Sequence, residues 1–211
     1  MVIQRGCMIS LDGLDGSGKS TQCLLLSEHF RALGKTTCLC QDPGSTELGR
    51  ALRQILLHHP DELCRMSEAT LFMAARAQMI SEVILPAMER NETVVCDRFI
   101  LATIAYQGYG SGLDIEGLRE ATRFAAGGLL PDLSIVLDLP VTTARARLGT
   151  HPDRLERRSL EFHQKVRDGF LEEAKRDSDR ICVIDADTTP ERVFTSVIQA
   201  IADWEARRAM V

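Results

Sequence analysis

Residues 7–21 have the sequence Cys-Met-Ile-Ser-Leu-Asp-Gly-Leu-Asp-Gly-Ser-Gly-Lys-Ser-Thr, and this stretch decides the fold class. Cys7 to Leu11 is short, apolar and close to the N-terminus, which predicts a buried β-strand. Gly13 to Ser20 then fits the pattern G-x-x-x-x-G-K-[ST]. Apolar residues recur every three or four positions from Cys23 to Leu33, which predicts the helix that must follow this loop. The stretch therefore indicates a phosphate-binding loop whose ligand is a nucleoside triphosphate with Mg²⁺.

Each fixed position of the loop has a chemical reason. Its glycines allow tight turns that direct backbone N–H groups at phosphate oxygens. Lys19 adds positive charge beside the β- and γ-phosphates, the Ser20 hydroxyl can ligate Mg²⁺, and the N-terminus of the helix faces the anion. The alternative is a glycine-rich turn in another α/β protein, which does not explain the flanking strand and helix. The residues expected to hold the triphosphate are Gly13, Leu14, Asp15, Gly16, Ser17, Gly18, Lys19, Ser20 and Thr21.

The composition favours a single globular domain over residues 1–211, with 45% hydrophobic and 26% charged residues. A net charge of −5 argues against a dedicated nucleic-acid binder. No uninterrupted apolar run approaches the roughly 18 residues of a membrane span, and no signal-peptide core precedes the first strand. Seven cysteines, an odd number without a C-x-x-C pair, indicate reduced thiols rather than zinc ligands or disulfides. We therefore expect a cytoplasmic protein that binds neither nucleic acid nor a membrane.

Strands and helices are predicted to alternate along the whole chain. This pattern predicts an α/β fold of the P-loop NTPase type, a three-layer sandwich in which a parallel sheet of about five strands has helices on both faces. After the first strand, the predicted strands are Thr36–Gln41, Thr93–Cys96, Leu133–Leu139 and Ile181–Asp185. The predicted helices cover about 18–33, 47–57, 67–90, 100–109 and 114–126, and a last helix carries Val193, Val197, Ile201 and Trp204 on one stripe.

Several side chains are placed for phosphate or base binding. Arg53 can offer its planar fork to phosphate oxygens, although a surface ion pair is the plainer interpretation. Phe72 and Arg76 share a helix face, where a ring and a guanidinium can take a flat base; on spacing alone, a core Phe72 and an exposed Arg76 are favoured. Asp97 and Arg98 follow a strand, at the edge where α/β sheets bind ligands, so Asp97 can act on Mg²⁺.

An arginine-rich segment over about 145–158 resembles a lid. Its arginines can stabilise the charge that develops on a transferring phosphoryl group while closure excludes water. The alternative is a solvated helix face. The basic residues of this segment are Arg145, Arg147, Arg154, Arg157 and Arg158.

The sequence resembles the thymidylate (dTMP) kinase family over nearly its whole length. The residues that carry this resemblance are Asp12-Gly-Leu-Asp-Gly-Ser-Gly-Lys-Ser-Thr-Gln22, Asp42-Pro-Gly-Ser-Thr46, Leu71-Phe-Met-Ala-Ala-Arg-Ala-Gln78, Asp97-Arg-Phe99, Ala105-Tyr-Gln-Gly108 and Asp153-Arg-Leu-Glu156. The loop alone would indicate only an NTPase or kinase, whereas the other motifs at these spacings are much more specific.

The resemblance implies transfer of the γ-phosphate of ATP to dTMP, forming dTDP for dTTP synthesis, with Mg²⁺ held through Ser20 and Asp97. It implies that Asp15 holds the 3′-hydroxyl, Phe72 stacks on thymine, and Arg76 bonds a thymine carbonyl. Thr103 and Gln107 would line the base pocket, Tyr106 would disfavour a 2′-hydroxyl, and Arg53 and Arg98 would hold the acceptor phosphate. The residues expected in catalysis are Lys19, Arg98, Arg154 and Asp15. Family members are usually homodimers, and the same is implied here.

Four positions depart from the family pattern. Gln41 and Asp42 stand where Arg-Glu is usual, Ala102 replaces a common serine, and Gly16 stands where some members have an arginine. The catalytic arginine should therefore come from the lid, where Arg154 is the best match and Arg145 and Arg147 are supporting candidates. Two alternatives remain at this point: a P-loop kinase for another nucleotide, and a nucleotide-binding regulator without catalysis.

Overall fold

The structure is a computed structural model and describes residues 6–150 and 152–209. Strands and helices alternate as predicted, but the ranges of the helices Val141–Ala146 and Leu160–Arg176 and the two π-helical turns were not predicted. In chain order they are β1 (Met8–Gly13), α1 (Lys19–Ala32), β2 (Thr37–Gln41), α2 (Glu47–His58), α3 (Arg65–Met79), η1 (Ile80–Ile84), α4 (Leu85–Glu89), β3 (Thr93–Asp97), α5 (Ile100–Thr103), η2 (Ile104–Gly110), α6 (Ile115–Ala125), β4 (Leu133–Asp138), α7 (Val141–Ala146), α8 (Leu160–Arg176), β5 (Ile181–Asp185) and α9 (Pro190–Ala209).

The sheet has five strands in the order β2-β3-β1-β4-β5, and every neighbouring pair is parallel. The predicted five-stranded parallel sheet is therefore confirmed. The central strand β1 is buried along its whole length, because strands pair with it on both sides and helices cover both faces. The register aligns Leu11 with Asp97 of β3 and Ile135 of β4, so the carboxyl ends of these strands meet at one edge.

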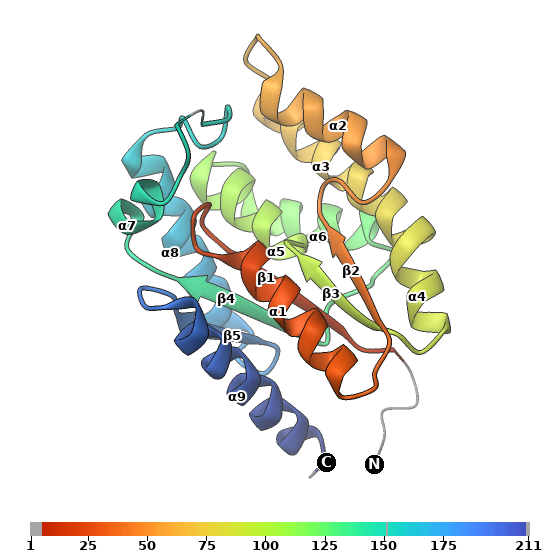
Figure 1. The fold of residues 1–211 in the computed structure, drawn as a ribbon. Helices are drawn as coiled ribbons and strands as arrows, with labels where there is room; N and C mark the ends of the chain where they lie inside the picture. The colour runs from red at the N-terminus through yellow and green to blue at the C-terminus, as the bar shows by residue number, and fades with distance from the viewer. Residues whose placement is uncertain (1–5, 151, 210–211) are drawn as a thin grey trace.

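Helices form a layer on each face of the sheet (Figure 1). Helices α1 and α9 pack together on one face, and α4, α5 and α8 lie on the other. The predicted apolar stripe of the last helix is confirmed, because Val193, Val197, Ile201 and Trp204 all belong to the buried core. Figure 1 also shows α2 rising above the sheet on the β2 side, while the segment after α7 rises on the opposite side. These two segments flank the carboxyl edge of the strands.

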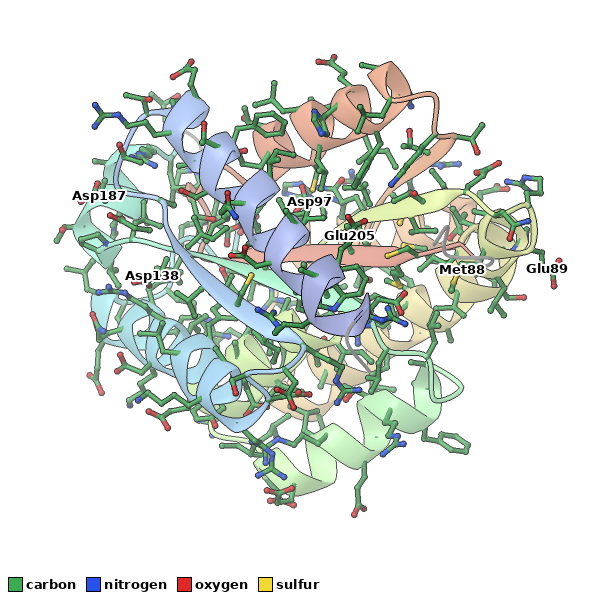
Figure 2. The ribbon with its side chains drawn as sticks, turned by 90° about the horizontal axis from the view of Figure 1, so that it is seen from below. Met88, Glu89, Asp97, Asp138, Asp187 and Glu205 are labelled. Atoms are coloured by element: carbon green, nitrogen blue, oxygen red, sulfur yellow. The ribbon has the colours of Figure 1, made fainter. Side chains whose placement is uncertain are left out.

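The long helix predicted over Ser67–Arg90 is divided into three parts. Helix α3 passes into the π-helical turn η1, and α4 continues to Glu89. Pro86 lies in the first turn of α4, where a missing N–H and a bulky ring disfavour regular α-helical bonding with the preceding turn. Figure 2 shows Met88 and Glu89 of this helix at the periphery, on the opposite side from Asp138 and Asp187, with Asp97 between them.

By length and composition alone, the segment Arg65–Glu89 could cross a membrane, because it contains an 18-residue window of mean hydropathy 1.3. Charged residues such as Glu68, Arg76 and Glu82 interrupt this segment, so it contains no uninterrupted apolar run of that length. Core helices have the same composition, and 39% of the window is buried. The remaining apolar character lies on an exposed stripe, which includes Met66, Ala74, Ala77 and Leu85 at helical spacing.

Candidate functional site

The loop between β1 and α1 lies at the carboxyl edge of the sheet and uses three glycines with positive φ. Gly13, Gly16 and Gly18 have φ of 136°, 83° and 91°, values that other residues rarely adopt. Ser17 N donates to Leu14 O at 3.2 Å and closes the turn. The predicted phosphate-binding loop therefore has the backbone form that its sequence requires.

Gly16 is also fixed by a neighbouring helix. A Cβ atom at this position would lie 2.2 Å from the carbonyl oxygen of Ala144 in α7. A side chain of any kind is excluded unless the backbone of α7 moves. This contact gives a physical reason why the chain has no arginine in the loop at this position.

A cleft that we call the P-loop pocket opens in front of this loop. Its lining residues are Asp15, Gly16, Gly18, Lys19, Ser20, Thr21, Gln41, Arg53, Asp97, Arg98, Arg147 and Glu156. Of the predicted triphosphate ligands, Gly13, Leu14 and Ser17 do not line the cleft and instead support the turn behind it.

Lys19 is the buried cation of the P-loop pocket. Its Nζ donates to Leu14 O at 2.7 Å. Burial, reinforced by the charge of Arg98, lowers the pKa of Lys19 to about 8. The ammonium is therefore positioned for an anionic partner that would restore its ordinary basicity.

Two oxygen ligands of the kind that Mg²⁺ prefers meet in the same cleft. Ser20 Oγ donates to Asp97 Oδ2 at 2.5 Å, although the two residues are far apart in the sequence. A hydroxyl and a carboxylate at this distance fit a Mg²⁺ site that is completed by phosphate oxygens and water. Among the residues that the structure describes, no group of three or more His, Cys, Asp or Glu side chains forms a metal site of its own.

Arg98 has φ of 71°, an unusual conformation for a residue other than glycine. Two hydrogen bonds hold it there: Arg98 N donates to Leu11 O at 2.9 Å, and Phe99 N donates to Asp12 Oδ1 at 3.3 Å. Its Nη1 donates to Gly13 O at 3.1 Å. Strain held by such contacts is typical of functional positions.

Asp15 lies between Arg98 and Tyr106. Its carboxylate forms an ion pair with Arg98 and accepts a hydrogen bond from the Tyr106 hydroxyl at 2.8 Å. Burial alone would raise the pKa of Asp15, but the charges of Arg98 and Lys19 outweigh it and hold the pKa well below its usual range. Asp15 is therefore an ionised acceptor at the junction of two pockets.

The second pocket, which we call the aromatic pocket, lies between α3 and η2. It is lined by Asp15, Asp42, Pro43, Arg53, Leu57, Phe72, Arg76, Arg98, Ala102, Thr103, Tyr106, Gln107, Asp153 and Leu155. All the predicted substrate residues line it. Phe72 is half-buried rather than part of the closed core, and Asp15, Arg53 and Arg98 line both pockets.

Arg76 is fully buried, with 1% of its surface exposed, so the plainer interpretation of an exposed charge is wrong. Its Nε donates to Asp42 Oδ2 at 2.5 Å, and its Nη2 donates to Thr103 Oγ1 at 2.7 Å. Nη1 has no hydrogen-bond partner among the described residues. The guanidinium is thus held rigidly with one nitrogen left for a ligand.

The departures at positions 41, 42 and 102 all lie at the two pockets. Asp42, the shorter carboxylate, still reaches Arg76. Gln41 lines the P-loop pocket, and Ala102 lines the aromatic pocket. Arg53 Nη1 donates to Pro43 O at 3.0 Å, which directs the guanidinium across the opening that both pockets share.

The lid arginines have partners that the sequence did not predict. Arg154, the predicted catalytic arginine, does not line the P-loop pocket; its Nε and Nη2 donate to Leu56 O at 2.9 and 2.7 Å, and Nη2 lies 2.6 Å from Glu68 Oε2. Sequence spacing could not reveal these partners, because they belong to α2 and α3. Arg147 is the lid arginine that lines the P-loop pocket, while Arg145 is exposed on α7.

Sequence reasoning missed three acidic residues near the pockets. Asp12 supports Arg98 through Phe99 N, Glu68 binds Gln107 and Arg154, and Glu156 lines the P-loop pocket. Asp12 lies in an apolar strand, and Glu68 lies one helical turn before Phe72 in α3; these positions were the available signals. Asp138, by contrast, forms an ion pair with Arg167 at 2.7 Å, which agrees with a structural role.

Comparison with known proteins gives a consistent result. The family model described as thymidylate kinase matches residues 11–197. The chain is 42% identical over 193 residues to a thymidylate kinase of Kosmotoga olearia, covering 90% of this chain and 93% of that protein. It is 44% identical over 200 residues to one of Pelotomaculum thermopropionicum, covering 93% of each. A crystal structure of thymidylate kinase from Ehrlichia chaffeensis matches with a TM-score of 0.78 at 31% identity, over 93% of this chain and 98% of that chain.

Proposed function

Because the chain belongs to the thymidylate kinase family and phosphorylates dTMP to dTDP, we propose that ATP binds at the P-loop pocket and dTMP in the aromatic pocket. The observation that carries this assignment is the junction of the pockets, where Asp15, Arg53 and Arg98 line both. Two phosphorylated ligands that meet there bring donor and acceptor phosphates together. We also propose that a single domain carries both pockets, since one edge of one sheet supplies them.

In the donor site, we propose that the loop glycines, Lys19 and Thr21 bind the triphosphate. Ser20 and Asp97 would hold Mg²⁺, which would supply positive charge to offset the negative charge of the phosphates during transfer. The 2.5 Å contact between these two side chains supports the assignment, because both oxygens already face the same point of the cleft.

In the acceptor site, we propose that Phe72 stacks on the base and that Arg76 donates to a base carbonyl through Nη1. The half-burial of Phe72 and the unpartnered Nη1 of Arg76 support these roles. We propose that Tyr106 closes the sugar side and that Asp15 accepts from the 3′-hydroxyl; the hydrogen bond from Tyr106 to Asp15 supports this arrangement. Arg53 and Arg98 would hold the 5′-phosphate at the junction.

The mechanism asks little covalent chemistry of the protein. The acceptor phosphate has a second pKa of about 6 and is largely dianionic at neutral pH, so a general base is not required. We propose that Lys19 and Arg98, which both line the P-loop pocket, supply positive charge to the transferred group, and that this charge and the alignment of the two phosphates supply the rate. From the lid we propose Arg147 as the arginine that reaches the phosphates, and Arg154 as the residue that anchors the lid.

We further propose that the protein is a homodimer in the cytoplasm. The exposed apolar residues of α3 and α4 support self-association, since covering exposed apolar surface with a second copy removes it from water. All seven cysteines are free, which fits a reducing compartment.

The assignment is tested by a coupled ADP-release assay with Mg-ATP and dTMP, dUMP, dCMP, dGMP or AMP as acceptor. We expect a clear preference for dTMP, since Arg76 is fixed to meet a carbonyl in the aromatic pocket. A higher kcat/KM for a purine monophosphate or dCMP would contradict the assignment of this pocket to thymine.

A further inference from the structure

Glu68 is a buried carboxylate that the proposed reaction does not use. It lies in the first turn of α3 with 1% of its surface exposed. Its Oε1 accepts a hydrogen bond from Gln107 Nε2 at 2.9 Å, and its Oε2 lies 2.6 Å from Arg154 Nη2. Burying a charge is costly unless it is paired. Arg154 supplies the opposite charge, and Glu68 thereby links Gln107 of the aromatic pocket to the lid.

The contact with Glu68 fixes the orientation of the Gln107 amide. A carboxylate has no hydrogen to donate, so Gln107 must turn its NH₂ group toward it. The other amide atom, Oε1, accepts no hydrogen bond from any residue in the described ranges. Because Gln107 lines the aromatic pocket, this carbonyl is a fixed acceptor that is available to a ligand.

A fixed donor lies next to this acceptor. Arg76 donates to Thr103, which is one helical turn before Gln107, so the guanidinium and the amide are neighbours. Asp42 and Thr103 occupy Nε and Nη2 of Arg76 and leave Nη1. The pocket therefore presents an N–H donor beside a carbonyl acceptor.

We propose that Glu68 is a positioning residue that makes the pocket discriminate thymine from cytosine. The proposal rests on the assignment of the aromatic pocket to the acceptor base. Thymine offers a carbonyl beside an N3–H donor, which matches the N–H donor of Arg76 and the carbonyl acceptor of Gln107. Cytosine offers an amino donor beside an unprotonated N3 and mismatches at both positions. An unrestrained glutamine could rotate its amide to suit either base, and Glu68 prevents this.

Arg154 makes the same carboxylate part of the lid. Its backbone N donates to Leu57 O at 3.2 Å, and its guanidinium binds Leu56 O as well as Glu68. The next residue, Leu155, lines the aromatic pocket together with Leu57. The ion pair between Glu68 and Arg154 thus connects Gln107, which selects the base, to the lid segment that carries Leu155, a residue that lines the same pocket.

The test is the ratio of kcat/KM for dTMP to that for dCMP in Glu68→Gln. The new amide can donate as well as accept, so the Gln107 amide is free to rotate. We expect the ratio to fall about ten-fold or more, the equivalent of one good hydrogen bond, while KM for Mg-ATP stays at the wild-type value. Glu28→Gln, the same change at an exposed position of α1, is the matched control and should leave the ratio unchanged.

A folded Glu68→Gln enzyme with the wild-type ratio would overturn the proposal. If this variant does not fold, Gln107→Leu decides, because it removes the acceptor that Glu68 orients: a reduced ratio supports the proposal, and the wild-type ratio refutes it. Wild-type enzyme in the same assay tests the pocket assignment separately. Failure of wild type to prefer dTMP would refute that assignment, whereas an unchanged ratio in the variant refutes only the role of Glu68.

Discussion

At the scale of single residues, the donor side depends on the charge of Lys19. Its pKa is lowered to about 8, mainly by burial and then by Arg98. The side chain is therefore charged below that pH in the free enzyme and loses its charge above it. Bound phosphates favour the ammonium form, so they shift its titration upward.

The lowered pKa of Lys19 predicts how kcat/KM for Mg-ATP and kcat change with pH. The value of kcat/KM for Mg-ATP, which reports the free enzyme, should fall above pH of about 8 with a slope approaching ten-fold per unit. The value of kcat should decline only at higher pH. The coupled assay from about pH 7 to 9.5 measures both, because the phosphate of dTMP, with its second pKa of about 6, is largely dianionic over this range. A kcat/KM that stays level up to about pH 9.5 would show that Lys19 is not titrating as inferred.

Residue-level prediction from the sequence worked where spacing along one element decides the geometry. The four-residue separation of Phe72 and Arg76 predicted their shared face, and both line one pocket. Spacing alone, however, favoured a core Phe72 and an exposed Arg76, and only the family resemblance predicted a base pocket. Their partners were not predictable in this way. Asp42 comes from the end of β2 and Glu68 meets a lid residue, so these contacts exist only after the fold brings distant segments together.

At the scale of elements, the phosphate loop is tight because α7 lies against it. The sequence predicted three glycines for turning and phosphate approach. The structure adds a packing reason at Gly16, where the Ala144 carbonyl leaves no room for a side chain. At Gly18, in contrast, an added Cβ would meet nothing within 4 Å.

The two glycines should therefore respond differently to alanine. Gly16→Ala combines a positive φ with a backbone clash, and we expect a loss of at least about 2 kcal/mol, or roughly 4–8 °C in Tm. Gly18→Ala should lower Tm less, because it carries only the conformational cost. Thermal denaturation of the two purified variants without ligand compares them. Equal shifts in Tm would contradict the contact with α7.

The lid arginines give a second prediction at this scale. Arg147 lines the P-loop pocket, whereas Arg154 is anchored to α2 and α3. Arg147→Ala should lower kcat by at least about ten-fold with little change in KM, the signature of an interaction made in the transition state. Arg154→Ala should lower kcat less and raise KM for dTMP, because it frees the pocket wall. A larger loss of kcat in Arg154→Ala would mean that closure brings Arg154 to the phosphates.

At the scale of the whole molecule, hydrophobic periodicity and the order of elements predicted the sheet and its helical layers well. A short apolar run is enough to predict each strand, and the right-handed crossover rule for parallel strands then limits how the strands and helices connect. The path of the lid and the π-helical turns were not predictable. The path of the lid depends on a few polar contacts with α2 and α3. Of the two π-helical turns, η1 depends on backbone adjustments near Pro86.

The proposed dimer belongs to this scale. Light scattering should give twice the chain mass of 23.4 kDa. Ala74→Arg, which places a charge on the exposed stripe of α3, should give the monomer mass at the same concentration. Leu24→Arg, on an exposed position of α1, is the control and should remain dimeric. A dimer that persists in Ala74→Arg would move the interface to another surface.

The most direct test of the two-pocket account is the steady-state kinetics of Phe72→Ala with dTMP and Mg-ATP varied separately. Loss of base stacking should raise KM for dTMP about 5- to 150-fold, while KM for Mg-ATP stays within about two-fold of wild type. Phe124→Ala, at a side chain that is 88% exposed on α6, should change neither value. Equal increases in both KM values, with a lowered Tm, would show that Phe72 supports the core and would contradict the assignment of the aromatic pocket to dTMP.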